Sequence, residues 1–162
     1  MTATAQRQFG YTLIDPVRLV TAETARAVLG LSHTEGVAEQ VDGGKIPFAF
    51  DLGRGGRRRE VRIWVGCLVE SVRYGDHERS IDLWNIDDVC AHALGTTEER
   101  IVAPEESEFR FTGSFLEGKW CISNVLVNDL VRSGDLRGHK VGKTTHVWRI
   151  SAFNFLKARQ IT

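Results

Sequence analysis

Asn124, Asn128 and Arg132 recur every four residues in the stretch NVLVNDLVR, so on a helix they would share one stripe. Side chains of these types form hydrogen bonds with the edges of nucleic-acid bases. Asparagine can pair with adenine through two bonds, and arginine commonly contacts guanine or phosphate. The spacing therefore predicts a helical surface that can contact bases.

Cationic and hydroxyl side chains cluster directly after this stretch. They are Arg137, His139, Lys140, Lys143, Thr144, Thr145 and His146. No Asp or Glu occurs from residue 136 to residue 162, so phosphate groups would be attracted there. We expect these residues, together with Ser123 at the start of the helix, to form a DNA-binding surface. The alternative is a solvated polar face without a ligand.

A second cationic stretch, DLGRGGRRREVR, spans residues 51–62 and is called the arginine loop below. It carries Arg54, Arg57, Arg58, Arg59 and Arg62 among flexible glycines, and such a loop could enter a narrow minor groove. The helix expected before it presents Glu35, Glu39 and Asp42, which repel phosphate. His33, Thr34 and Gln40 remain as candidate contacts on that helix.

Residue patterns typical of enzymes and metal sites are absent from the sequence. There is no G-x-S-x-G, P-loop, GxGxxG or HExxH motif. Cys67, Cys90 and Cys121 are far apart and odd in number, and the five histidines lack zinc-ligand spacing. We therefore expect no catalytic activity, no metal and no cofactor.

The elements that must position the cationic stretches occur twice in the chain. Residues 19–47, LVTAETARAVLGLSHTEGVAEQVDGGKIP, are similar to residues 110–138, RFTGSFLEGKWCISNVLVNDLVRSGDLRG. In each copy a threonine and a serine are spaced to cap two successive helices, and a glycine is placed to end the second helix in a left-handed conformation. These residues are Thr21, Ser32 and Gly44 in the first copy, and Thr112, Ser123 and Gly134 in the second.

A hairpin and a closing helix are expected after each helix pair. Phe48, Phe50 and Leu52 alternate before the arginine loop and Val61 and Ile63 alternate after it, as in a half-buried hairpin. The second hairpin would turn near Gly142 and Lys143. Apolar residues then predict short helices over 65–72 and 151–157.

The segment SNVLVNDLVRSGDLRGHKVGKTTHVWRI resembles the DNA-binding domain of excisionases and MerR-like winged helix-turn-helix proteins. The similarity covers residues 112–158 well and residues 19–72 loosely. The resemblance implies that the second helix enters a major groove of DNA. It also implies that the hairpin, or wing, contacts the neighbouring backbone or minor groove.

We therefore predict an α+β, mostly helical chain with two winged helix-turn-helix modules. The first module spans residues 15–72 and the second residues 111–162. A flexible N-terminus (1–14) precedes them, and an acidic connecting segment (73–110) joins them. Residues 65–111 contain 4 basic and 11 acidic residues, a net charge of −7, although the whole chain has no net charge.

The acidic segment is expected to contain three features. These are a strand with Ile81 and Leu83, a helix over 86–94 capped by Asn85, and an acidic loop around Pro104. It could be a spacer, a self-association surface or a restraint on the basic wing, and the sequence does not choose among these.

The expected function is sequence-specific binding of double-stranded DNA, with the second module binding through helix and wing and the first mainly through its arginine loop. We place a transcriptional regulator first and an excisionase-like accessory factor of a phage or plasmid second; partition and packaging proteins would use the same contacts. The alternatives are a winged-helix protein-protein adaptor and, for the first module, a role in packing or dimerisation alone.

Without a run of about 20 apolar residues or a signal peptide, we expect a cytoplasmic protein. We expect no effector domain after the second module and therefore no small-molecule effector, and self-association stays open.

Overall fold

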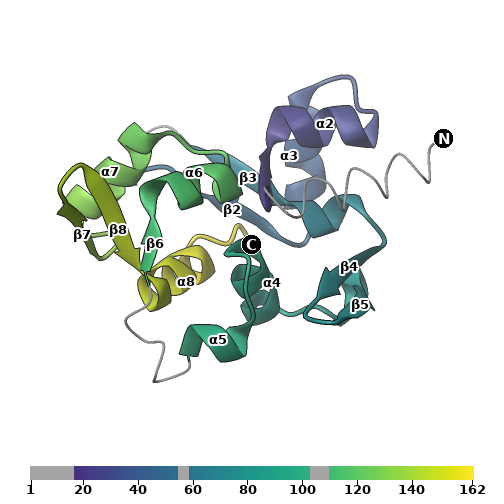
Figure 1. Cartoon of the computed structure of the whole chain (residues 1–162). Helices are drawn as coiled ribbons and strands as arrows, with labels where there is room; N and C mark the ends of the chain where they lie inside the picture. Colours follow the sequence, from purple (N-terminus) through teal and green to yellow (C-terminus); the bar gives the residue numbers. More distant parts are fainter. Residues whose placement is uncertain (1–16, 55–58, 103–109) are drawn as a thin grey trace.

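A computed structural model of the chain describes residues 17–54, 59–102 and 110–162. Helices alternate with short antiparallel strands in three small sheets, which confirms the α+β class (Figure 1). The expectation of a mostly helical chain is not confirmed. The predicted flexible N-terminus and the loop around Pro104 lie outside the described residues. Within the described ranges, no helix has both the length and the apolar character needed to cross a bilayer.

The first module begins with a short strand followed by a capped helix. Its elements are β1 (Leu19–Thr21), α2 (Ala22–Leu29), α3 (Thr34–Asp42), β2 (Ala49–Asp51), β3 (Val61–Trp64) and the 3₁₀ helix η1 (Val65–Leu68). The Thr21 hydroxyl accepts a hydrogen bond from the Thr24 amide, as predicted. Gly44, with φ of 79°, adopts the expected left-handed conformation after α3. Ser32, however, is not the cap of α3, because the helix begins one residue later, after His33.

The second module repeats the same order of elements. These are β6 (Arg110–Thr112), α6 (Gly113–Trp120), α7 (Asn124–Ser133), β7 (Gly138–Val141), β8 (Thr144–Trp148) and α8 (Arg149–Ala158). In both sheets the first strand pairs with the third and the third with the second, giving the orders β1-β3-β2 and β6-β8-β7. Thr21 lies opposite Arg62 and Thr112 lies opposite His146, so the two cap residues occupy equivalent positions.

The two modules differ in the helix that follows their last strand. The predicted helix over 151–157 is present within α8, but the helix predicted over 65–72 is wrong after Leu68. Val69 is extended, and the chain enters β4 (Ser71–Tyr74), where Val72 is buried. The apolar residues that suggested a helix here instead serve a hairpin.

The acidic segment contains more regular structure than the sequence predicted. β4 pairs with β5 (His77–Ser80), and η2 (Ile81–Leu83), α4 (Ile86–Ala93) and α5 (Glu98–Val102) follow. The strand expected at Ile81 and Leu83 is therefore wrong, since these residues form a 3₁₀ turn. The predicted cap of α4 is confirmed: the Asn85 side chain accepts from the Asp88 amide at 2.9 Å.

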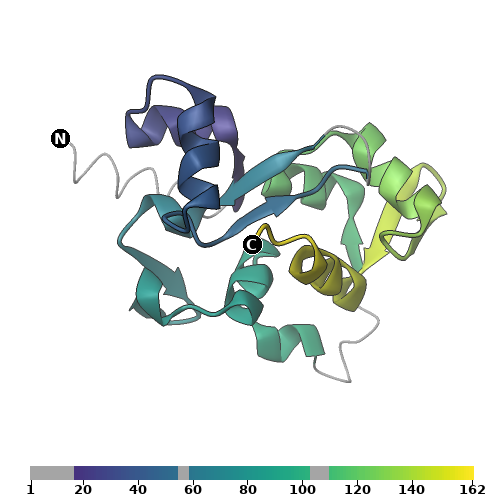
Figure 2. The ribbon, with the colours of Figure 1, turned by 180° about the vertical axis from the view of Figure 1, so that it is seen from behind.

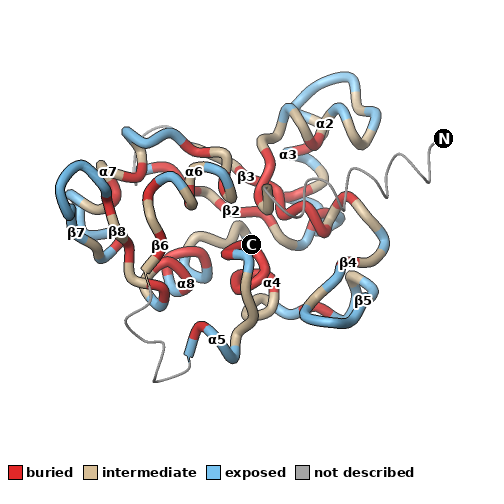
Figure 3. The backbone as a smooth tube through the Cα atoms, in the orientation of Figure 1, coloured by how far each residue is buried: buried red, intermediate tan, exposed pale blue. Residues whose placement is uncertain are grey.

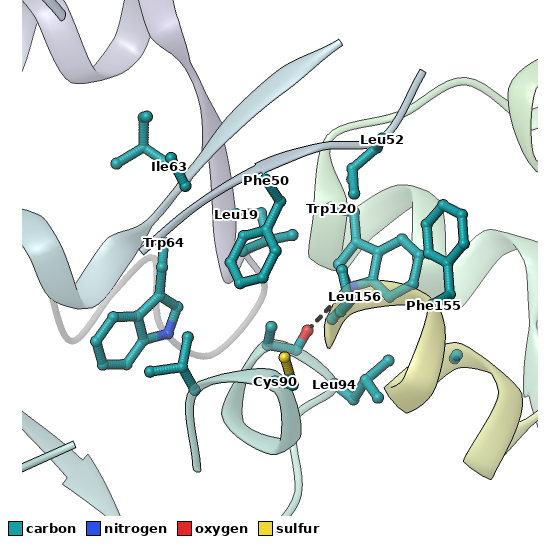
Figure 4. Close-up of a cluster of buried hydrophobic side chains, with 14 of the residues drawn as sticks. Leu19, Phe50, Leu52, Ile63, Trp64, Cys90, Leu94, Trp120, Phe155 and Leu156 are labelled. Atoms are coloured by element: carbon teal, nitrogen blue, oxygen red, sulfur yellow. Dashed lines mark hydrogen bonds between the residues drawn. The ribbon is translucent and has the colours of Figure 1, made fainter. Parts of the chain in front are cut away.

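One hydrophobic core joins both modules and α4 (Figure 4). Phe50 of the first module, Cys90 of α4 and Trp120 of the second module are all fully buried. The Trp120 indole donates to the Ala93 carbonyl at 3.1 Å. The acidic segment is thus built into the fold through the apolar side of α4.

Polar contacts also fix one module to the other. Arg62, on β3, donates to the carbonyls of Trp120 and Cys121 at the end of α6. The C-terminal segment runs along β2: the Asp51 amide donates to the Arg159 carbonyl, and the Ile161 amide donates to the Ala49 carbonyl. Figure 2 shows this segment beside β2.

Candidate functional site

The helix α7 has the boundaries and caps that the sequence predicted. The Ser123 hydroxyl accepts from the Leu126 amide at 3.1 Å, and Gly134 ends the helix with φ of 87°. Val127 and Leu130 are fully buried against the core. The opposite side of α7 is therefore held toward solvent.

Four residues on this outer side of α7 are called the α7 face below: Asn124, Val125, Asn128 and Arg132. Asn124 is exposed, Asn128 is half-buried, and the Arg132 side chain is 78% exposed. Val125 is 69% exposed and was not among the residues predicted to contact DNA. Its signal was available, because Val125 lies away from the apolar stripe of Val127 and Leu130. Exposed segments of α7 and of the neighbouring β7–β8 hairpin are visible together in Figure 3.

Asn128 is held in place by the β7–β8 hairpin. The Thr145 hydroxyl, on β8, donates to the Asn128 carbonyl oxygen at 2.6 Å. Thr145 is only 5% exposed, so the prediction that it contacts DNA needs correction. Its hydroxyl positions the Asn128 side chain, whose NH2 group remains a hydrogen-bond donor.

The β7–β8 hairpin presents its cations at the tip, as expected. Val141 and Thr144 are paired across a two-residue turn at Gly142 and Lys143, and Gly142 adopts φ of 64°. Lys140, Lys143 and Thr144 are exposed. Val141 is 55% exposed and adds an apolar group at the same tip.

The base of this hairpin carries a second group of polar residues. His139 lies opposite His146 in the sheet, and Nε2 of His139 is 3.1 Å from Nη1 of Arg110. The Arg110 guanidinium stacks over the Trp148 ring at 4.5 Å. Sequence reasoning missed Arg110 because it was assigned to the acidic segment. Arg137 is exposed, and its backbone amide donates to Ser151.

A carboxylate that the sequence analysis did not weigh lies beside the α7 face. The Asp129 carboxylate is 3.0 Å from Nη1 of Arg132 and 3.7 Å from Nη1 of Arg54. The i, i+3 spacing of Asp129 and Arg132 is the signal that could have revealed the first contact. The contact with Arg54 joins the two modules and has no local signal.

The other arginines of the arginine loop have different surroundings. Arg59 is exposed and lies 3.5 Å from the Asp51 carboxylate, whereas Arg57 and Arg58 lie outside the described residues. Arg62 is only 8% exposed and donates to backbone carbonyls. Arg62 therefore has a structural role, which corrects its inclusion among the loop arginines that were expected to reach DNA.

The candidate contacts on α3 do not join the α7 face. Thr34 is exposed in the first turn of α3, and Gln40 is half-buried. The α3 and α7 helices lie at opposite ends of the molecule in both views of the ribbon (Figures 1 and 2). The structure thus brings together α7, the β7–β8 hairpin and Arg54, and leaves Thr34 and Gln40 apart from them.

Burial raises the pKa of Cys67 and of Cys90 to about 12, so neither thiol is ionised at neutral pH. In the parts of the chain that the structure describes, no three His, Cys, Asp or Glu side chains gather where they could hold a metal ion.

Comparison of the chain with protein-family models, with curated proteins and with solved structures found no match in any of the three.

Proposed function

We propose that the protein binds double-stranded DNA in a sequence-specific way, with the second module acting as a winged helix-turn-helix domain. The observation that carries this proposal is the α7 face lying next to a hairpin whose exposed tip holds Lys140 and Lys143. The chain from residue 136 to residue 162 offers no carboxylate to oppose them. In this arrangement α7 enters the major groove and the hairpin contacts the backbone beside it.

Each part of the α7 face has a chemical role in such a complex. Asn124 and Asn128 present amide groups to base edges, and Asn128 is oriented by Thr145 before DNA arrives. Val125 is placed to contact a thymine methyl group. Arg132 reaches a guanine or a phosphate once it leaves Asp129.

Of the roles that use these contacts, we favour a transcriptional regulator, and then an excisionase-like recombination factor of a phage or plasmid. Partition and packaging proteins would use the same surface. A footprint on the natural upstream DNA would distinguish them, because it gives the length of the site and its place relative to genes or recombination sites.

A protein-protein adaptor is the second candidate, and a specific observation favours it. Val125 and Val141 are both more than half exposed, on α7 and at the tip of the neighbouring hairpin. Exposed apolar side chains of this kind also occur where proteins dock.

The test uses DNA duplexes selected from a random library by the unmodified chain, with affinity measured by fluorescence anisotropy over a range of salt concentrations. Phosphate contacts make the affinity fall steeply with salt, whereas an apolar protein interface would respond little. We expect Lys143→Gln to lower the salt slope by about 1, and Arg132→Ala to cost about 1–3 kcal/mol of base discrimination.

Arg73→Gln serves as the matched control, because Arg73 is exposed on β4 in the acidic segment. If no duplex is enriched, or if Lys143→Gln and Arg132→Ala bind like Arg73→Gln, the proposed function is wrong.

A further inference from the structure

We propose that the hairpin of the first module is a second wing of the same DNA site, so that one chain covers one continuous stretch of DNA around α7. This inference rests on the proposed function. It replaces the expectation of two separate DNA-binding modules, which followed from the repeat in the sequence.

The first step is the direction of the β2–β3 hairpin. In both ribbon views the strands β2 and β3 run from the rest of the first module toward α7 (Figures 1 and 2). Arg54, just after β2, has Nη1 3.7 Å from the Asp129 carboxylate of α7. A cation of the first module is therefore already at the DNA-facing helix of the second.

The second step is that both strands of this hairpin are anchored to the second module. On β3, the buried Arg62 donates to the Cys121 carbonyl at 2.7 Å, in the turn that leads into α7. Beside β2, the Arg159 guanidinium donates to the carbonyls of Asp51 and Gly53 and lies 3.6 Å from the Asp135 carboxylate, in the turn that follows α7. These contacts fix the position of Arg54 relative to α7.

The third step is that the two hairpins contact neighbouring residues of α7. Asn128 accepts from Thr145 of the second-module hairpin, and Asp129 lies near Arg54 of the first-module hairpin. Consecutive residues on a helix point about 100° apart. The exposed Val125 and Arg132 thus lie between one hairpin and the other, as a central helix lies between two flanking wings.

The fourth step is electrostatic. The Arg54 side chain is 48% exposed and the Arg132 side chain 78% exposed, and both lie near the single Asp129 carboxylate. An exposed ion pair of this kind contributes little to stability. One carboxylate does not balance two guanidinium groups, so this cluster keeps a net positive charge. A DNA phosphate can therefore replace Asp129 as the partner of Arg54 and neutralise that charge, without unfolding the contact region.

Arg59 provides an internal comparison. Arg59 belongs to the same loop, but its Nε atom lies 3.5 Å from the Asp51 carboxylate. It also lines a cavity of the first module together with Thr34 and Asp42 of α3. Arg54 and Arg59 carry the same charge and are separated by five positions, yet only Arg54 has a contact with α7 among the ion pairs of the described residues.

The experiment uses the full chain and a duplex selected from a random library. Affinity is measured against salt, and backbone protection is mapped by hydroxyl-radical footprinting, for the Arg54→Gln, Arg54→Lys, Arg73→Gln and Lys143→Gln variants. We expect Arg54→Gln to lower the salt slope by about 1 and to shorten the protected stretch at one end, with no gap inside it. Arg54→Lys should keep the slope, and Arg73→Gln, on β4 in the acidic segment, should match the unmodified chain.

Two results would overturn the inference while leaving the proposed function intact. Arg54→Gln could leave slope and footprint unchanged while Lys143→Gln lowers the slope. Arg54→Gln could instead remove protection from a patch separated by unprotected DNA, which would indicate two independent sites. If neither Lys143→Gln nor Arg132→Ala changes binding, the proposed function itself fails. Thermal unfolding of each variant separates these outcomes from a loss of folded protein.

Discussion

Asn128 and Asp129 are neighbours in α7, yet each is fixed by a different part of the chain. Thr145 of β8 donates to the Asn128 amide oxygen, and the Asp129 carboxylate lies near Arg54, which follows β2. A side chain that is already oriented loses less conformational freedom when it binds a ligand. At the scale of single residues, the α7 face is therefore organised in the absence of any ligand.

The Thr145→Val substitution tests this orientation. Valine keeps the shape of threonine but cannot donate to Asn128, so we expect a loss of about 1 kcal/mol in the free energy of unfolding. Base discrimination should also weaken, because the Asn128 amide is no longer held in one orientation. Urea denaturation and anisotropy with mismatched duplexes measure the two effects.

Thr144→Val is the control for this experiment, since Thr144 is exposed on the same strand. If Thr145→Val and Thr144→Val have equal unfolding midpoints and equal discrimination, the hydrogen bond to Asn128 has no positioning role.

At the scale of elements, helix caps with a local signal were predicted correctly except at Ser32, whereas contacts between distant segments were not predicted. Ser123 caps α7 and Asn85 caps α4, as their sequence context indicated. The structural role of Arg62 could not be seen, because an arginine beside a glycine-rich loop has the same local pattern whether it faces solvent or carbonyl groups. The β4–β5 hairpin was missed because Val69 and Val72 also fit a short apolar helix.

The serines that begin the second helix of each module make a matched pair. Ser123 accepts from the Leu126 amide, whereas Ser32 precedes His33, the residue at the cap position of α3, where no side-chain cap bond forms. We expect Ser123→Ala to lower the free energy of unfolding by about 1 kcal/mol, because an amide of the first turn loses its acceptor. Ser32→Ala should change it by no more than about 0.5 kcal/mol.

Chemical denaturation of both variants and of the unmodified chain provides the measurement. Equal losses at Ser123 and Ser32 would mean that α3 is capped like α7 in solution, and would contradict the difference between the two helices.

At the scale of the whole molecule, the repeated modules and the acidic segment form one folded unit. The C-terminal segment adds to β2, Arg62 crosses to the end of α6, and α4 contributes Cys90 to the shared core. Lys157 of α8 and Asp87 of α4 are also 2.8 Å apart. The sequence repeat suggested two units in a row, but the contacts that join them involve residues more than 50 positions apart.

Substitution of Arg62 tests most directly how the two modules are held together. Its guanidinium satisfies the Trp120 and Cys121 carbonyls, and Cys121 has the left-handed φ of 53° that is unusual for a residue other than glycine. We expect Arg62→Met to lower the free energy of unfolding by roughly 2–3 kcal/mol, because carbonyl groups at the end of α6 lose a charged donor. Arg59→Met is the control, and equal urea midpoints for the two variants would contradict this role.

His92 makes the stability of the joined core depend on pH. Burial, with the nearby charge of Arg18 adding to it, holds the pKa of His92 well below its ordinary value, and Nδ1 accepts from the Trp64 indole at 3.0 Å. His92 is therefore neutral in the folded chain, whereas in the unfolded chain it takes up a proton below about pH 6.5. The unfolded state then binds more protons, so the free energy of unfolding falls as the pH is lowered below that value, by up to about 1.4 kcal/mol per pH unit from this group.

Urea denaturation from pH 7.5 to pH 5 measures the slope, and NMR titration of the histidine ring protons identifies the group. His33→Gln and His77→Gln, at exposed positions, should leave the slope unchanged. A His92 ring that titrates near pH 6.5 in the folded chain would show that this core admits the charged form.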